Sequence, residues 1–474
     1  MLSKNELEKI LDTALAAGGD FADIFMEKKV TTVIGCEDNK IERVNTGIDM
    51  GAGVRVISGA TTSYAYTNDI SLSGLLKIAQ VASQAAKSSQ HFQPVKITKK
   101  VPQFDFDIEM MPDQVSITQK VEQVQLANAG ARSIDEKIKQ VSVGYGDVIQ
   151  DVWIANSLGD QVEDRRVRTR LVVHAVASKQ GQVQTGYESV GGTQGFEIFK
   201  CHNTEELGKA AGERACALLQ AAPAPAGKMP VVMASEAGGT MVHEACGHGL
   251  EADLVQKKLS VYGDKIGQKV ASSLVTVIDD ATIMGKYGTY RFDDEGNHGR
   301  KKVLIENGVL KGYMYDYLTA QKDQRQSTGN GRRESYREKP IPRMSNTYIA
   351  FGKNDDAEKI IKDTKNGLFV KKMGGGQVNT TNGDFVFDVA EGYIIEDGEI
   401  KNMVRGATLT GNGPKALIMV DRVGSDLGFA IGTCGKDGQG APVSNAQPTI
   451  RIQELVVGGT APTETKSKTT IKRL

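Results

Sequence analysis

The sequence has little of what marks several large classes of protein. Aromatic residues make up 6% of it, one tryptophan is present, and 58 Lys+Arg are balanced by 58 Asp+Glu. Nucleic-acid-binding proteins need a basic stripe with interleaved aromatic side chains, so we expect no direct nucleic-acid binding. The five cysteines are an odd number without framework spacing, which favours a reducing compartment and predicts a cytoplasmic protein.

Long apolar runs are also missing. No run approaches the roughly 20 residues of a membrane span, and the first twenty residues predict an amphipathic helix rather than a signal peptide. We therefore expect no membrane contact. At 474 residues the chain is too long for one ordinary core, so two or three domains are expected.

The pattern of the first half predicts an α+β domain with an antiparallel sheet and helices. Ser3 and Glu6 form a capping box for a helix to about Leu15, and Asn203 caps a helix to about Gln220. Helices are also predicted over 72–87 and 114–134. Short strands with two-residue periodicity, separated by turn residues, are predicted over 21–29, 31–37, 41–49, 51–57, 61–66, 140–145, 151–156 and 166–179.

An Ala/Pro-rich segment, 221–227, is the clearest linker. It predicts a boundary between domains 1–222 and 223–474. The second domain should be β-rich, because Asn307-Gly308, Asn382-Gly383 and Asp397-Gly398 are signals for type I′ hairpin turns. One helix is predicted over 356–366, and frayed residues over 463–474.

One short segment of the second domain carries the groups of a zinc hydrolase. His243 and His248 supply neutral nitrogens for a metal, and Glu244 supplies a base for an activated water. The usual spacing of such histidines is i, i+4, whereas here it is i, i+5. On an ideal helix that spacing puts the side chains about 140° apart. Either His248 lies beyond the helix end, or the helix contains a π-bulge or bend, which the flanking Gly247 and Gly249 would ease.

The residues alone leave alternatives open. His243 could be a satisfied core histidine, and His248 could cap a helix C-terminus. A hydrolytic zinc site needs a third protein ligand. Glu251 and Asp253 are close in sequence, while Cys434 lies far away in a glycine-dense loop, 432–440. A lone cysteine is usually a small buried hydrophobe, so these residues do not decide between Cys434 and Glu251.

The second half resembles the TldD/PmbA family of metallopeptidases over essentially the whole domain. The similarity is carried by the segments 243–250, 292–296, 328–336, 342–348, 374–377, 432–440 and 458–461, in that order. The first half is similar to the family mainly in organisation and in the segment 52–55.

This resemblance implies a third ligand and a cofactor. Active members of the family carry an HExxxH segment on a distorted helix together with a distant cysteine, which correspond here to His243, Glu244, His248 and Cys434. One Zn²⁺ for each active subunit is implied, and Glu251 becomes a supporting carboxylate. The resemblance further implies a homodimer, or a heterodimer with a metal-free paralogue, that cuts unfolded or leader-like peptides with low sequence stringency.

Substrate contacts are predicted less directly. Gly374, Gly375 and Gly376 would give a peptide backbone room to approach, although tight turns explain such glycines equally well. Arg332 is a candidate for holding a substrate carboxylate or an acidic partner; with Arg333 it could instead form a solvated pair or an internal salt bridge. Asp293-Asp294 is either an acidic pair that orients a ligand histidine or an ordinary turn.

Three other functions use parts of the same pattern. A small-molecule zinc amidohydrolase would share the chemistry but would have a closed pocket. A structural zinc site would need no base beside its ligand, which Glu244 argues against. A non-catalytic regulatory or nucleic-acid-associated protein would want the basic stripe that this sequence lacks.

Overall fold

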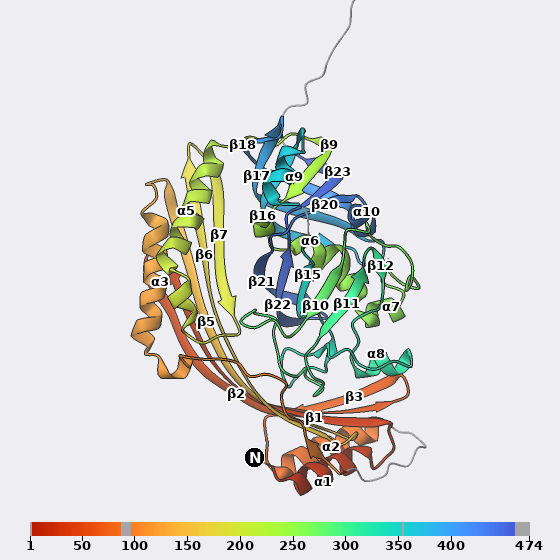
Figure 1. The fold of residues 1–474 in the computed structure, drawn as a ribbon. Helices are drawn as coiled ribbons and strands as arrows, with labels where there is room; N and C mark the ends of the chain where they lie inside the picture. The colour runs from red at the N-terminus through yellow and green to blue at the C-terminus, as the bar shows by residue number, and fades with distance from the viewer. Residues whose placement is uncertain (1, 87–95, 353–354, 460–474) are drawn as a thin grey trace, which may run out of the picture.

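The computed structural model describes residues 2–86, 96–352 and 355–459. It confirms an α+β fold, with an antiparallel N-terminal sheet backed by helices and a β-rich C-terminal half (Figure 1). The predicted frayed segment, 463–474, lies outside the described residues. The boundary at residues 222/223 stays a prediction.

A long, curved sheet forms the N-terminal half. Its path is β3-β2-β1-β5-β6-β4, with β7 added beside β6. The strands are β1 (Phe21–Glu37), β2 (Lys40–Ser58), β3 (Thr61–Thr67), β4 (Thr98–Lys99), β5 (Ile138–Asn156), β6 (Asp160–Lys179) and β7 (Gln182–Gly192). The predicted strand at 61–66 is confirmed as β3, but the prediction of separate short strands within 21–57 and within 140–156 was wrong. Val30 stays paired with both Ile48 and Ile149, so the two runs on either side of it are one strand. Strand β7 was not predicted.

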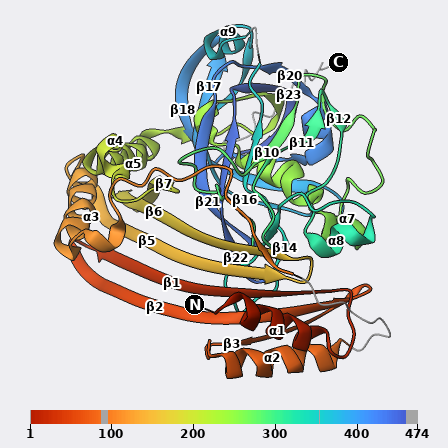
Figure 2. The ribbon, with the colours of Figure 1, turned by 60° about the horizontal axis from the view of Figure 1, so that its bottom comes forward.

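Helices cover this sheet at both ends (Figure 2). At one end lie α1 (Lys4–Leu15) and α2 (Leu72–Ala85); at the other lie α3 (Ile117–Arg132), the short α4 (Ile198–Cys201) and α5 (Thr204–Gln220). The predicted capping box of Ser3 with Glu6 and the Asn203 cap are confirmed. Helices α3 and α5 pack closely because Gly208 has no side chain: a Cβ there would lie 2.0 Å from the Ala127 carbonyl oxygen.

Two larger sheets build the C-terminal half. The six-stranded sheet contains β10 (Val277–Asp280), β11 (Lys301–Glu306), β12 (Val309–Leu310), β15 (Asn346–Ile349), β21 (Gly428–Lys436) and β22 (Gln439–Gln447). The eight-stranded sheet contains β8 (Ala222–Pro223), β9 (Gly227–Met233), β16 (Asn366–Val378), β17 (Asp384–Glu396), β18 (Glu399–Arg405), β19 (Thr408–Asn412), β20 (Val420–Val423) and β23 (Ile450–Gly458). Strands β13 (Gly331–Arg332) and β14 (Ile341–Pro342) pair in a separate two-stranded ribbon. Short helices connect strands of this half: α7 (Ala252–Gln256), α8 (Tyr317–Lys322), α9 (Ala357–Lys362) and α10 (Gly413–Ile418).

Five strands of the eight-stranded sheet close into a ring. Strand β16 pairs with β9 on one side and with β17 on the other, and β23 and β19 complete the circuit. The hairpin turns at Asn307-Gly308 and Asp397-Gly398 are confirmed, because both residues of each pair have positive φ. At Asn382-Gly383 only the glycine does, and the five residues 379–383 connect β16 to β17. The prediction of a two-residue turn there was wrong.

Buried charges join the two halves. Arg55, 1% exposed, pairs with Asp23 of its own sheet and at 2.8 Å with Glu295 of the C-terminal half. Arg166 repeats the pattern, bonding Asp164 beside it and Asp294 across the interface at 2.6 Å. We refer to these six residues as the interface ion network. Among the helices described, none is long and apolar enough to span a bilayer.

Candidate metal centre

An irregular helix carries the two predicted histidine ligands. One turn of α6 (Thr240–Val242) leads into a π-helical turn, η3 (His243–Gly247), followed by a 3₁₀ turn, η4 (His248–Leu250). The backbone N–H of His248 donates to the carbonyl of His243, five residues earlier. This extra residue brings the rings back onto one side, with centroids 4.9 Å apart and planes at 85°. Of the two distortions that the spacing allowed, the structure has the π-bulge.

Gly247 and Gly249 leave space for neighbouring side chains, and their backbone torsion angles are not unusual. Gly247 has an ordinary helical φ of −52°. A Cβ there would lie 2.3 Å from the Met344 sulfur, and one on Gly249 would lie 2.7 Å from the Tyr262 ring. These glycines therefore allow close packing against Met344 and Tyr262, and not the backbone distortion that was expected of them.

Cys434 reaches the histidines from a strand. The glycine-dense segment predicted as a loop is a hairpin of β21 and β22, closed by a turn at Asp437-Gly438 with φ of 50° and 76°. The Cys434 Sγ lies 3.3 Å from the His248 Nε2, and the ligand atoms of Cys434, His243 and His248 all lie within 4.8 Å of one another. Two ligands of a tetrahedral zinc ion are roughly 3.3–3.7 Å apart. The three donors therefore fit one such ion with little adjustment.

Each histidine is held by a partner on its other ring nitrogen. His243 Nδ1 lies 2.8 Å from the Asn445 Oδ1, and His248 Nδ1 lies 3.0 Å from the Glu251 Oε2. Both rings can therefore present Nε2 to a metal, the arrangement that fixes ring orientation in metalloproteins. Asn445 was missed, since its role depends on the pairing of β22 with β21.

The acidic pair at 293–294 does not orient a ligand histidine. Asp294 binds Arg166 and the Arg333 backbone, and Asp293 accepts hydrogen bonds from Asn297. The pair belongs to a turn and to the contact between the two halves.

The electrostatics of the site favour an ionised sulfur. Burial opposes ionisation of Cys434, but hydrogen bonds and charge from His243 and His248 lower the pKa of its thiol to about 5. Glu251 is fully buried, yet Lys436 and His248 lower its carboxyl pKa to about 2. Lys436 binds Glu251 at 3.1 Å and Asp253 at 2.6 Å. Glu251 thus orients a ring, whereas Asp253 pairs with the lysine behind it.

A cavity of about 720 Å³ opens onto the three donors. Glu244, half-buried, lines it beside His243, as do Gly375 and Gly376 of β16. The pairing of β16 with β17 passes from Met373 directly to Gly376, so Gly374 and Gly375 lie in a β-bulge. Bulges expose unpaired backbone groups and are frequent beside active sites.

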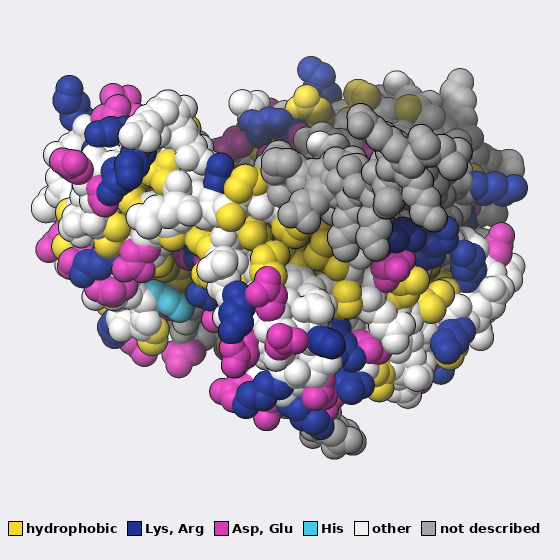
Figure 3. All heavy atoms as spheres, turned by 90° about the horizontal axis from the view of Figure 1, so that it is seen from above, with side chains coloured by type: hydrophobic (Ala, Val, Ile, Leu, Met, Phe, Trp, Pro, Cys, Tyr) yellow, Lys and Arg dark blue, Asp and Glu magenta, His cyan; other side chains and the backbone are white. Residues whose placement is uncertain are grey.

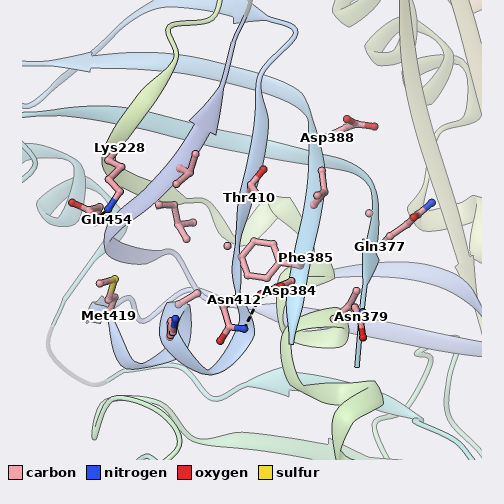
Figure 4. Close-up of a pocket in the computed structure, with 18 of the residues that line it drawn as sticks. Lys228, Gln377, Asn379, Asp384, Phe385, Asp388, Thr410, Asn412, Met419 and Glu454 are labelled. Atoms are coloured by element: carbon pink, nitrogen blue, oxygen red, sulfur yellow. Dashed lines mark hydrogen bonds and ion pairs between the residues drawn. The ribbon is translucent and has the colours of Figure 1, made fainter. Parts of the chain in front are cut away.

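A second cavity, of about 1290 Å³, shares the wall 375–378 with the first. It lies across strands β9, β16, β17, β19 and β23 of the ring (Figure 4). The Phe385 ring lies near its middle, and Lys228 pairs with Glu454 at 3.0 Å on its far side. The two cavities together extend well beyond a pocket for a single small molecule.

The predicted arginine pair lies elsewhere. Arg332 and Arg333 are 5% and 6% exposed, so a solvated pair is wrong. The Arg332 guanidinium donates to the carbonyl oxygens of Met344 and Pro442 and lines a different cavity from Glu244. The five cysteines are all free.

Comparison with known proteins covers nearly the whole chain. Three family models match in order: PmbA/TldA metallopeptidase domain 1 over residues 22–86, the central domain over 111–219 and the C-terminal domain over 226–459. A metalloprotease of Methanocaldococcus jannaschii is 38% identical over 95% of this chain and 99% of its own length. A metalloprotease TldD homolog of Haemophilus influenzae is 36% identical over 97% of each chain. The crystal structure of TldE from Thermococcus kodakarensis superposes with a TM-score of 0.77, at 19% identity, over 96% of this chain and all of that one.

Proposed function

Because this chain belongs to the PmbA/TldD family of metallopeptidases, we propose that it is a zinc-dependent peptidase whose ion is held by His243, His248 and Cys434. The observation that carries the proposal is the convergence of these three donors in the cavity that Glu244 also lines. Two imidazoles and one thiolate suit zinc better than a hard cation. A bound zinc ion supplies Lewis acidity toward water and the scissile carbonyl.

Glu244 is the proposed general base. Its carboxylate follows the first ligand on the π-turn and lines the cavity where a peptide bond would lie. It takes a proton from the attacking water and returns it to the leaving amine. Asn445 and Glu251 hold the two imidazoles in place during this exchange. A structural zinc site would need neither a base beside its ligand nor a cavity for a substrate.

Extended peptides, unfolded or leader-like, are the proposed substrates. The bulge at Gly374 and Gly375 leaves backbone groups for pairing with a peptide strand. A Cβ on Gly375 would meet nothing within 4 Å, whereas one on Gly376 would lie 1.9 Å from the Phe387 ring, so only Gly375 leaves open room. Pairing through the backbone reads little sequence, which suits loose specificity. The adjoining cavity along the strand ring supports this reading over a small-molecule amidohydrolase, which would enclose its substrate.

A dimer in the cytoplasm is the proposed assembly, either of two copies or with a metal-free paralogue. The similarity of fold to TldE motivates the second form. We do not assign nucleic-acid binding. The face in Figure 3 mixes basic and acidic side chains instead of gathering one sign, and the whole chain is neutral.

Two variants test this proposal separately. Cys434→Ala should lose both zinc and peptide hydrolysis, measured by elemental analysis and digestion of unfolded peptides with and without chelator. Glu244→Ala should keep zinc but lose about 10²–10⁴-fold in turnover. Cys201→Ala, at an exposed cysteine, is the matched control and should change neither. Full zinc content in Cys434→Ala would refute the ligand set, and undiminished turnover in Glu244→Ala would refute the base.

A further inference from the structure

A third cavity, of about 250 Å³, lies between the two halves of the molecule. Arg166, Arg168 and Arg170 line it from β6, and Arg332 lines it from the C-terminal half. Residues that alternate along a strand share one face, so the three β6 arginines all point toward the C-terminal half. Pockets for drug-sized ligands measure roughly 300–1,000 Å³. This cavity suits a smaller occupant.

Two of its arginines are buried without a carboxylate partner. Arg168 is 7% exposed and Arg332 is 5% exposed. Arg168 donates from Nε to the Tyr287 carbonyl at 3.2 Å and from Nη2 to the Thr289 carbonyl at 3.3 Å. Within the described ranges neither guanidinium takes part in an ion pair, whereas Arg166 beside them has Asp164 and Asp294. Neither charge therefore has a direct ion-pair partner, and among the carboxylates described the only one that raises the pKa of both is Asp294, which Arg166 already binds.

The two guanidiniums also repel each other. Burial, together with the positive charge of Arg332, lowers the pKa of Arg168 to about 10, and Asp294 opposes this shift. Burial likewise lowers the pKa of Arg332. A buried charge without a counter-ion carries a desolvation penalty that no attraction offsets. An anion between the two groups would remove both the repulsion and the desolvation cost.

We propose that this cavity is a binding site for a small oxyanion, held between Arg168 and Arg332. The hydrogen bonds to backbone carbonyls leave Arg168 Nη1 and Arg332 Nε for such a ligand, and the planar guanidinium matches carboxylate and phosphate oxygens. Exposed Arg170 stands at the mouth, where its Nη1 lies 3.4 Å from the Thr433 hydroxyl. Thr433 also lines the metal cavity, next to Cys434.

Two sources provide this chemistry. One is a free anion such as inorganic phosphate. The other is the terminal carboxylate of a peptide, a source that rests on the proposed peptidase function. Because Thr433 borders both cavities, a peptide lying at the metal centre has a short route to the arginines.

Calorimetric titration of the full-length, metal-loaded protein with inorganic phosphate, at ionic strength balanced by chloride, tests the site. We expect one phosphate per chain, and binding weaker by at least about tenfold in Arg168→Gln. Arg165→Gln is the matched control: Arg165 lies on the same strand, faces the other way and pairs with Asp151 in solvent. No phosphate binding by the unchanged protein, or equal weakening in both variants, would overturn the proposal.

A second measurement uses only the unchanged protein, so it does not depend on whether a variant folds. Crystals of the unchanged protein soaked in selenate should give an anomalous peak between Arg168 and Arg332, and a cavity without that peak would overturn the site. Peptides with free and amidated C-termini then identify the source. Displacement of phosphate by the free acid alone assigns a peptide carboxylate, and displacement by neither assigns a free anion. Phosphate binding involves no turnover, so failure of the peptidase proposal would leave this result standing.

Discussion

The interface ion network and the metal centre are both buried and polar, but they are composed differently. In the network each guanidinium meets acids from both halves of the chain, as Arg55 does with Asp23 and Glu295. At the metal centre three electron-pair donors converge, and the outer nitrogens of both rings already have partners in Asn445 and Glu251. The four carboxylates of the network outnumber its two guanidiniums, and Arg291 and Arg333 supply further positive charge to Asp164 and Asp23. The candidate metal centre instead combines two imidazoles and a sulfur that could bind an ion. Substitutions in the network should therefore change stability, whereas substitutions at the centre should change metal affinity.

The largest effect should follow from breaking the network. Arg55→Ala leaves Glu295 buried without its cation and Asp23 with only the more distant Arg333 at 3.8 Å, which should cost about 3–5 kcal/mol of unfolding free energy. Urea denaturation measures the loss. The matched control is Arg165→Ala, whose exposed pair with Asp151 should contribute only about 0–1 kcal/mol. Equal midpoints for the two variants would show that the network does not hold the halves together.

A smaller effect is expected at the metal centre. Glu251→Gln removes the charge that orients His248, which should weaken metal affinity by about 10–100-fold, measured by competition with a chelator. Asp253→Asn is the control, since Asp253 shares Lys436 with Glu251 but makes no bond to a ligand histidine. If both variants lost affinity equally, the lysine rather than the ring contact would be responsible.

The smallest effect concerns pH. Burial, with Asp316 adding to it and Arg55 opposing, raises the pKa of Glu295 to about 8. A folded-state pKa above the ordinary 4.5 means that the protonated carboxyl stabilises the fold at low pH, and this contribution is lost as pH rises toward about 8. The Tm of the protein should therefore fall more between pH 5 and pH 8 than the Tm of Glu295→Gln. The same slope in both would exclude Glu295 as the titrating group. Glu334→Gln, at an exposed site, should behave like the unchanged protein.

Local chemistry in the sequence predicted local structure well. The caps at Ser3 and Asn203 depend only on neighbouring residues, and both helices begin where expected. The i, i+5 spacing predicted either a helix end before His248 or a distorted helix, and the second is present as a π-turn. These features follow from contacts within a few residues along the chain.

Features that depend on strand pairing were not predictable in this way. Turn-like residues suggested breaks in β1 and β2, but β1 has partners on both sides at its predicted break, and β2 stays paired with β1 through its own. Asn445 has no motif of its own, and only the register of β22 brings it to His243. Spacing left Cys434 and Glu251 as equal candidates for the third ligand, and it was the family resemblance that favoured the cysteine.

The β21–β22 hairpin carries two atoms with different tasks. Its first strand bears the Cys434 sulfur, and its second bears the amide oxygen of Asn445, which aligns the His243 ring. Antiparallel pairing fixes the separation of these two atoms, so a tilt of the hairpin displaces both together. The tight bend at Asp437-Gly438, which contacts neither histidine, thereby helps to fix where the sulfur and the amide oxygen lie relative to the two imidazole rings.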